Sequence, residues 1–193
     1  MVPPTCVGCG TRGSALCDAC ACGMDPPCEP ARFPFVDRVV APWDYGGAAR
    51  KLILDLKLRG LAAAADPLVA GMTDHLLRRG SSADWITWVP CRSGDRRRRG
   101  FDHAEVLARG VALRLGLPRR PALRRVGSSV DQAGLSASER ARNLRGTFRA
   151  TPVGGSVLLV DDLVTTGATA SACARALRSA GASGVEVMVA CRA

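Results

Sequence analysis

The sequence predicts an α/β fold, in which a parallel sheet carries helices on both faces and a small zinc-binding module precedes it. Strand, helix and strand patterns alternate from residue 85 onward, and this order favours a parallel sheet. Residues 157–160 form a short, unbroken apolar run, as expected for a strand covered on both faces. Six of the nine cysteines lie within the first 28 residues and mark the module. The 193 residues, 47% of them hydrophobic, suffice for one core and a small appendage.

The cysteine-rich module is predicted to span residues 1–30. Two Cys-x-x-Cys pairs can supply four thiolates to a tetrahedral zinc ion. A disulfide framework is the alternative, and a reducing cytoplasm argues against it. Four thiolates leave no open coordination position, so we expect a structural zinc. Either Cys22 or Cys28 could replace one member of the expected ligand set, which is Cys6, Cys9, Cys17 and Cys20.

The main domain is predicted to span residues 33–193. Apolar periodicity and glycine stops place four elements in its first half: a strand over 38–45, helices over 48–59 and 66–79, and a strand over 85–89. Ser93 and Gly94 are expected to turn the chain after that strand. Asp102 and Glu105 form a capping pattern for a helix that ends at Gly116.

The second half of this domain is predicted to contain a mobile loop and the end of the sheet. Segment 124–148 is polar and glycine-punctuated, which is typical of a loop. Its Ser136-x-x-Glu139 capping box predicts a short helix over 139–144. The last three elements are expected to be the strand over 157–160, a small-residue helix that ends near Gly181, and a strand over 185–189.

The composition predicts a folded protein without membrane insertion. No run of about 18 uncharged apolar residues occurs. The first ten residues lack the basic and apolar regions of a secretory signal. We therefore expect a cytoplasmic protein.

Positive charge is concentrated in residues 92–149. This region holds 15 arginines against five acidic residues, which accounts for the net charge of +10. Such a field attracts a polyanion, either pyrophosphate or a nucleic-acid backbone. Aromatic residues make up only 4% of the chain and none stands among residues 92–99, which argues against binding by base stacking. The alternative is a solvated arginine surface.

Two adjacent carboxylates, Asp161 and Asp162, are expected at the carboxyl end of the strand over 157–160. Ligands of open α/β sheets bind outside this end of the strands, so the position predicts a site. Neighbouring shielded carboxylates repel each other. They therefore need a cation, such as hydrated magnesium, or hydroxyl donors, such as a sugar diol.

The loop that follows the two carboxylates opens a helix. Free N–H groups and the positive end of the dipole attract an anion at such a helix start. We expect a phosphate to bind the loop residues Thr165, Thr166, Gly167, Ala168 and Thr169. The alternative is that the aspartates only start a turn and the threonines only cap the helix.

The segment VLLVDDLVTTGAT, residues 157–169, resembles the phosphoribosyl pyrophosphate (PRPP) motif of type I phosphoribosyltransferases. Three further blocks narrow the resemblance to the ComF family, whose members join a short cysteine zinc module to a domain of that fold. The blocks are WDYGGAARKLILDLK at 43–57, RRGFDHAEVLA at 98–108 and DQAGLSASERARNLRGTF at 131–148. Asp102 and His103 stand where many relatives carry Asn-Gln. We therefore expect a solvated His103 without a catalytic role.

The resemblance implies a role for each candidate site residue. Asp161 and Asp162 would be the catalytic pair, holding the ribose hydroxyls directly or through magnesium, and residues 165–169 would hold the 5-phosphate. The pyrophosphate loop would contain Arg92, Ser93, Arg98 and Arg99. The flexible loop that closes over the ligand would contain Gln132, Arg140 and Asn143.

Two functions remain open at this point. The family's association with DNA uptake implies a protein of natural competence that binds PRPP or ribose phosphate with magnesium. Such a protein would handle single-stranded DNA and have competence proteins as partners. The alternative is an active phosphoribosyltransferase of nucleotide metabolism or salvage.

Overall fold

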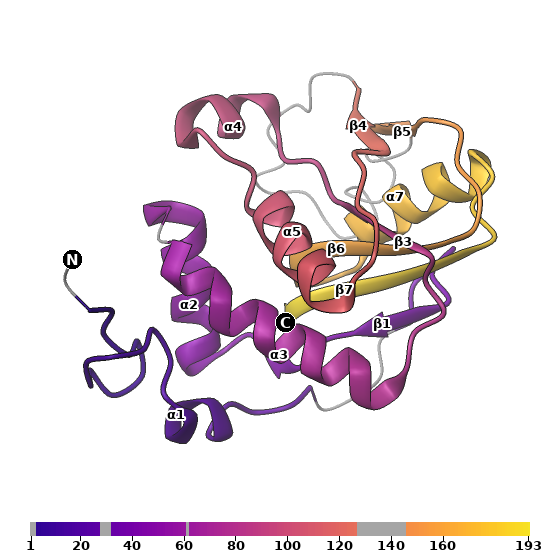
Figure 1. Cartoon of the computed structure of the whole chain (residues 1–193). Helices are drawn as coiled ribbons and strands as arrows, with labels where there is room; N and C mark the ends of the chain where they lie inside the picture. The colour runs from indigo at the N-terminus through magenta and orange to yellow at the C-terminus, as the bar shows by residue number, and fades with distance from the viewer. Residues whose placement is uncertain (1–2, 28–31, 61, 127–145) are drawn as a thin grey trace.

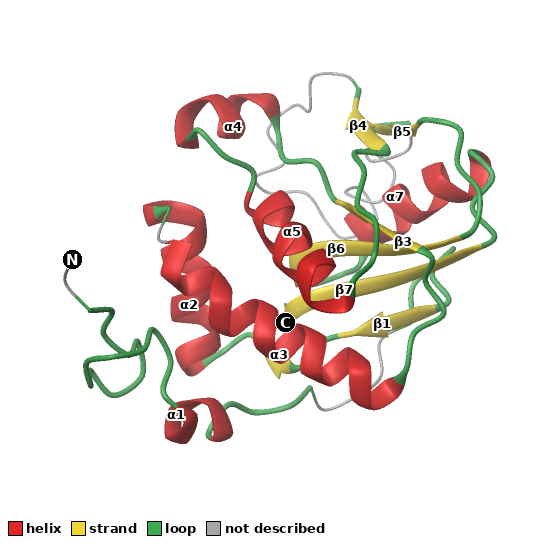
Figure 2. Ribbon diagram, in the orientation of Figure 1, coloured by secondary structure: helices red, strands yellow, loops and turns green. Residues whose placement is uncertain are grey.

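A computed structural model describes residues 3–27, 32–60, 62–126 and 146–193. Its centre is a five-stranded sheet in the order β1-β7-β6-β3, in which β2 also pairs with β7 (Figures 1 and 2). Every pairing in this sheet is parallel, so the predicted fold class is confirmed. The strands are β1 (Arg38–Val40), β2 (Trp43–Asp44), β3 (Trp85–Trp88), β6 (Ser156–Val164) and β7 (Gly184–Arg192).

Helices cover both faces of the sheet, as predicted (Figure 2). One face carries α2 (Gly47–Arg59), α3 (Ala65–Arg79) and α5 (His103–Leu115), and the other carries α7 (Ala168–Ser179). Alternation of side chains along β6 supplies both cores. Leu158 and Val160 pack in the cluster of the three helices, whereas Leu159 packs in the cluster of α7. No helix of the described ranges is long and apolar enough to cross a membrane.

Local signals set the ends of several helices as predicted. Asp102 caps α5, because its carboxylate accepts hydrogen bonds from the amides of Ala104 at 3.0 Å and Glu105 at 3.4 Å. The same helix ends at Gly116, whose φ of 66° is a left-handed conformation that glycine adopts without strain.

The predicted turn at Ser93 and Gly94 is wrong. These residues begin a short helix, α4 (Ser93–Arg99), which ends at Gly100 with a φ of 79°. Asp95 and four successive arginines follow Gly94, and arginine has a high helix propensity. The helix therefore forms despite the glycine in its first turn.

The ends of the predicted loop over 124–148 form a small second sheet. Strand β4 (Leu123–Arg125) pairs antiparallel with β5 (Phe148–Ala150) beside α7. Leu123 and Phe148 are buried in the same apolar cluster as α7. The mostly polar sequence of this segment gives no sign of that tertiary contact. The short helix expected over 139–144 lies outside the described residues, as do Gln132, Arg140 and Asn143.

Strand β6 is longer than the predicted 157–160. Its pairing with β3 ends at Val160, but its pairing with β7 continues to Val164. The two aspartates therefore lie inside β6 rather than after it. They still lie beyond the end of the neighbouring strand β3, so they are at the carboxyl end of the sheet, as expected.

The N-terminal module packs against α2. It contains the short helix α1 (Asp18–Cys22), and its Cys6 and Leu16 are buried in the same apolar cluster as α2. Lys51 of α2 donates a hydrogen bond to the carbonyl of Val7 at 3.0 Å. The module and the sheet domain therefore share one core, and the predicted boundary near residue 30 lies outside the described residues.

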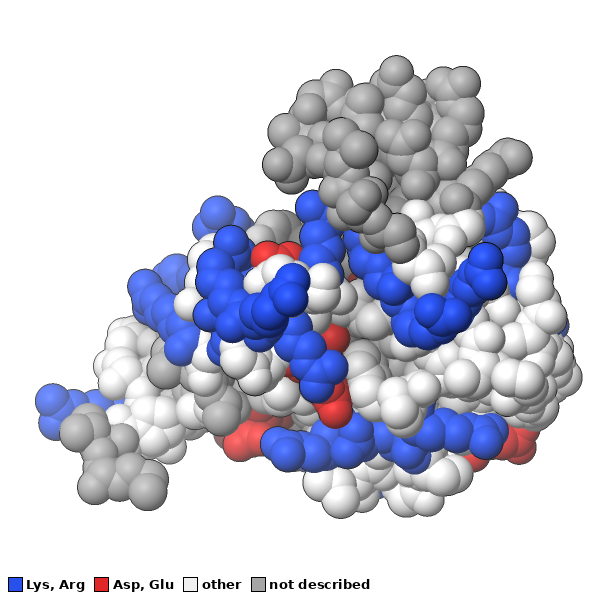
Figure 3. Space-filling view, turned by 90° about the horizontal axis from the view of Figure 1, so that it is seen from above, with Lys and Arg blue, Asp and Glu red and all other residues white. Residues whose placement is uncertain are grey.

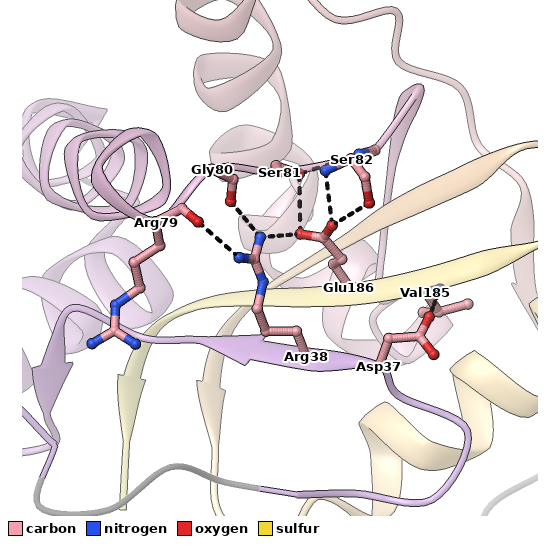
Figure 4. A network of polar contacts seen from close by, with 9 residues as sticks. Asp37, Arg38, Arg79, Gly80, Ser81, Ser82, Val185 and Glu186 are labelled. Carbon is pink, nitrogen blue, oxygen red and sulfur yellow. Dashed lines mark hydrogen bonds and ion pairs between the residues drawn. The ribbon is translucent and has the colours of Figure 1, made fainter.

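A buried carboxylate, Glu186, ties three segments together at the amino end of the sheet (Figure 4). It lies 2.5 Å from Arg38 of β1 and accepts hydrogen bonds from the hydroxyl of Ser81 and from the amide and hydroxyl of Ser82, each at 3.0 Å. Burial raises the pKa of Glu186, but the Ser82 amide, Arg38 and the two hydroxyls outweigh burial and leave this pKa below its usual value. The contacts therefore stabilise the folded protein through the ionised carboxylate.

Glu186→Gln should lower the free energy of unfolding by about 2 kcal/mol at pH 7, because Arg38 and the three donors of Ser81 and Ser82 lose an ionised acceptor. A pKa that is lower in the folded state stabilises the protein above the unfolded-state pKa, about 4.3, and this stabilisation is lost as the pH falls through the folded-state pKa. Urea unfolding from pH 7 to about pH 2 should show the difference shrinking below about pH 4. Glu105→Gln, whose ion pairs span 3.6 and 3.8 Å, should cost less. A pH-independent difference would contradict the prediction.

Candidate functional site

Asp161 and Asp162 occupy opposite faces of β6, because successive strand residues alternate. Asp162 points to the face of α2 and α5 and is only 2% exposed. Asp161 points to the other face, where it borders a cavity of about 80 Å³ together with the loop over 165–169. The adjacent carboxylates therefore have different neighbours.

The buried carboxylate of Asp162 contacts two basic side chains. Lys57 Nζ, from the last turn of α2, lies 2.5 Å from Asp162 Oδ2, and His103 Nε2, from the first turn of α5, lies 3.5 Å from Oδ1. The sequence indicated that this pair of aspartates needs a cation or hydroxyl donors, and Lys57 supplies a cation. The expectation of a solvated His103 is wrong: its side chain is only 12% exposed, because the start of α5 packs over Asp162.

The two carboxyl groups differ in acidity. Burial raises the pKa of Asp162, but His103 and Lys57 outweigh burial and leave this pKa well below its usual value. Burial and the neighbouring charge of Asp162 raise the pKa of Asp161 well above its usual value. Asp162 is therefore the ionised member of the pair, and Asp161 is the member that holds a proton more readily.

The loop after β6 leads directly into the start of α7, as predicted. Thr165 and Thr166 are exposed, and Gly167, with a φ of 71°, is the residue before the first turn of α7. The first amides of a helix have no partner within it, and the helix dipole adds positive potential there. Gly167 also allows a close contact with the ring of Phe33, which lies 2.1 Å from the place that a Cβ at this position would take. The segment before β1 therefore packs against the loop.

The arginine loop borders a second and larger cavity. A space of about 670 Å³ lies between the residues of α4 and those of β4. Of the four residues predicted for pyrophosphate, the structure places Arg92, Ser93 and Arg98 in its lining, and it leaves Arg99 outside. Lys and Arg side chains dominate this face of the molecule in the space-filling view (Figure 3).

Strand β4 adds a basic residue that the sequence analysis missed. Arg125 lines the same cavity, and its guanidinium lies 4.8 Å from the centre of the Phe148 ring. Burial and then the charge of Arg92 lower the pKa of Arg125. Its Nε is buried without a hydrogen-bond partner among the described residues. The guanidiniums of Arg92 and Arg125 therefore line one space, an arrangement that suits a phosphoryl group.

The buried thiol of Cys173 in α7 is affected by charges from both sides. Burial and then the charge of Asp161 raise the pKa of this thiol, and Arg125 lowers it.

The four predicted zinc ligands lie together. The sulfur atoms of Cys6, Cys9, Cys17 and Cys20 are all within 4.8 Å of one another, whereas Cys22 is exposed and outside this group. Amides that donate to sulfur, of Cys9 first and then of Cys17, lower the pKa of Cys6 to about 6. The neighbouring sulfurs raise the pKa of Cys20 to about 12. Cys28 lies outside the described residues.

Lys57, His103 and Arg125 are the site residues that sequence reasoning missed. The family blocks included Lys57 and His103 without assigning them a role. Lys57 is one of only two lysines in an arginine-rich chain, which is the signal that could have drawn attention to it. Nothing in the sequence near Arg125 separates it from the other arginines, since only the pairing of β4 with β5 brings it to the cavity.

Sequence comparison gives relatives over most of the chain. The DNA utilization protein YhgH of Salmonella typhi is 32% identical over 191 residues, which cover 92% of this chain and 84% of that protein. The protein of the same name from Escherichia coli K12 is 33% identical over 163 residues, covering 80% and 72%. Competence protein F of Haemophilus influenzae is 32% identical over 96 residues, covering 47% and 42%. No family model matches the chain.

Among solved structures, the glutamine PRPP amidotransferase of B. subtilis, complexed with ADP and GMP, shares 26% identity at a TM-score of 0.44. The overlap covers 65% of this chain and 26% of that enzyme. The sequence relatives carry the assignment, because the similarity covers 92% of this chain. The chain belongs to the ComF family, together with the DNA utilization proteins YhgH and competence protein F.

Proposed function

We propose that the protein binds PRPP or a ribose phosphate at the carboxyl end of β6 and that this binding serves DNA uptake or utilization. The observation that carries the proposal is the meeting of Asp161, the 165–169 loop and the start of α7 around one cavity. A carboxyl group suits the ribose hydroxyls, and the helix start suits the 5-phosphate. The arginine cavity with Arg92 and Arg125 suits the pyrophosphate.

Magnesium fits this site only in part. The ligand atoms of His103, Asp161 and Asp162 lie within 4.8 Å of one another and could hold an ion. Magnesium prefers oxygen ligands and keeps several waters, so Asp161 and the phosphate oxygens of the ligand are the suitable partners. The ion would neutralise charge on the pyrophosphate. Lys57 already balances the charge of Asp162.

The Cys6, Cys9, Cys17 and Cys20 cluster fits a structural zinc ion. Four thiols this close cannot all ionise without a cation, which is why the neighbouring sulfurs raise the pKa of Cys20. A zinc ion would take all four as thiolates and leave no open position. Such a site implies a reducing compartment, in agreement with the expected cytoplasmic location.

A role with DNA is supported by the relatives and by the charge of the arginine face. The relatives are named for DNA utilization and for competence. Trp85 and Trp88 are buried, with Arg120 4.1 Å and Arg119 5.4 Å from their ring centres, so these two rings are not free to stack on bases. We therefore propose binding of the phosphate backbone of single-stranded DNA without base stacking.

Replacing Asp161→Asn together with Asp162→Asn should abolish magnesium-dependent PRPP binding in calorimetry, a loss of about 100-fold or more, because hydrogen bonds to charged groups contribute about 1.5–3 kcal/mol each. Circular dichroism should show an unchanged fold. The matched control is Asp66→Asn with Asp74→Asn, which removes two exposed carboxylates of α3. Equal PRPP affinity in the two double variants would contradict the assignment.

Zinc analysis of the purified protein should give one ion per chain, because the four sulfurs form a single group. Cys20→Ser should lose the zinc and lower the melting temperature, since metal binding contributes to folding. Cys22→Ser, two residues away and outside the cluster, should keep both. Protein that is free of zinc, or that loses it equally in both variants, would refute this site.

Arg92→Ala with Arg125→Ala should weaken binding of single-stranded DNA and make it less salt-dependent. Each lost phosphate contact should reduce the slope of log K against log salt by roughly 0.7. Arg109→Ala with Arg114→Ala removes two exposed arginines of α5 that do not line the cavity, and it should change the slope less. Fluorescence anisotropy from 50 to 200 mM salt measures both. Similar slopes in the two double variants would indicate a diffuse basic surface instead.

A further inference from the structure

The carboxylate of Asp162 already has two basic groups of the protein beside it. Lys57 Nζ lies 2.5 Å from one of its oxygens, and His103 Nε2 lies 3.5 Å from the other. The side chain is 3% exposed, and α2 and α5 supply its two partners. A ligand or a metal ion that bound this carboxylate would have to displace one of the two basic groups.

Asp161 has the opposite surroundings. It borders the cavity that the 165–169 loop also lines, and Asp162 is not part of that lining. One of its oxygens, Oδ1, accepts a hydrogen bond from the amide of Asp162 at 2.9 Å. The position of the Asp161 carboxyl is thus coupled to the place that Asp162 takes between the two helices.

We propose that the acidic pair is divided between two tasks. Asp161 contacts the ribose of the ligand, and Asp162 is a positioning residue whose charge is balanced by Lys57 in place of a divalent cation. The proposal rests on the function proposed above. It adds Lys57 to the site and states which part of the ligand requires magnesium. His103 is the second group that holds Asp162 in place.

The metal requirement follows from Coulomb's law. A divalent cation on Asp162 would stand beside the Lys57 ammonium within a few ångströms, and the two positive charges would repel each other strongly at a site shielded from water. The ribose 5-phosphate half of PRPP should therefore bind without a divalent cation. The magnesium dependence of PRPP binding then belongs to its pyrophosphate.

The test uses the full-length zinc-loaded protein and ribose 5-phosphate as the probe, in metal-depleted buffer with and without magnesium chloride. Omitting a chelator keeps the zinc in place. The wild-type protein should bind the probe equally in both buffers by calorimetry. Lys57→Met should bind at least about tenfold more weakly without magnesium, because Asp162 keeps an unbalanced charge. Added magnesium should restore part of this loss, since the ion can now take the place of the ammonium.

Two controls separate this role from a general effect on folding. Lys51→Met removes the other lysine of the same helix, which bonds the Val7 carbonyl within the described part of the chain, and it should bind the probe as the wild type does. Lys57→Arg keeps the positive charge and should retain metal-independent binding. The acquired magnesium dependence of Lys57→Met is a readout that a purely structural role would not produce.

A second variant covers the case in which Lys57→Met does not fold. Lys57→Met with Asp162→Asn removes both charges, leaves no unbalanced charge in the core, and should bind ribose 5-phosphate without magnesium. Loss of binding in this double variant would mean that Asp162 itself contacts the ligand, and it would overturn the proposal. Magnesium-dependent binding by the wild type would overturn it as well. A wild-type protein that binds neither ribose 5-phosphate nor PRPP in either buffer would instead refute the proposed function.

Discussion

The burial of β6 on both faces is the constraint on which the site depends. Its central residues are all apolar, since α2, α3 and α5 cover one side and α7 covers the other. A two-residue period then sends any adjacent pair of residues into two different cores. Asp161 and Asp162 continue this pattern at the end of the strand. Their separation into unlike surroundings is therefore a consequence of strand geometry and needs no special backbone conformation.

This separation explains how two neighbouring carboxyls are tolerated. If both were ionised in the same shielded space, repulsion and the cost of desolvation would oppose folding. In the fold, Lys57 and His103 instead lie beside the carboxylate of Asp162. Asp161 lies beside the threonine loop, and its pKa is raised. One carboxyl group is a fixed anion, and the other can donate or accept a proton in a hydrogen bond.

Sequence reasoning succeeded where the relevant contacts are local. The cap at Asp102, the stop at Gly116 and the loop before α7 depend on neighbours within one turn, and each was predicted. The four cysteines that lie together also follow from spacing alone. Lys57 and Arg125 could not be found in this way, because α2 meets β6, and β4 meets the arginine loop, only through tertiary packing. The pairing of β7 with β6 beyond Val160 likewise lengthened a strand whose apolar run had ended.

The two ends of the sheet differ in how their charges are balanced. At the amino end, Glu186 pairs with Arg38, and Asp37 lies 2.5 Å from Arg178, so acids and bases match within the protein. At the carboxyl end, the described lining of the cavity beside α4 has five arginines and one carboxylate, that of Asp95. Glu105, outside this lining, lies 3.8 Å from Arg96. Like charges that line one space repel each other, and an anion that enters the space relieves the repulsion. The amino end of the same sheet shows that the fold can match acids and bases within the protein. The excess of arginines at the carboxyl end is therefore a reason to expect that this cavity binds an anionic ligand.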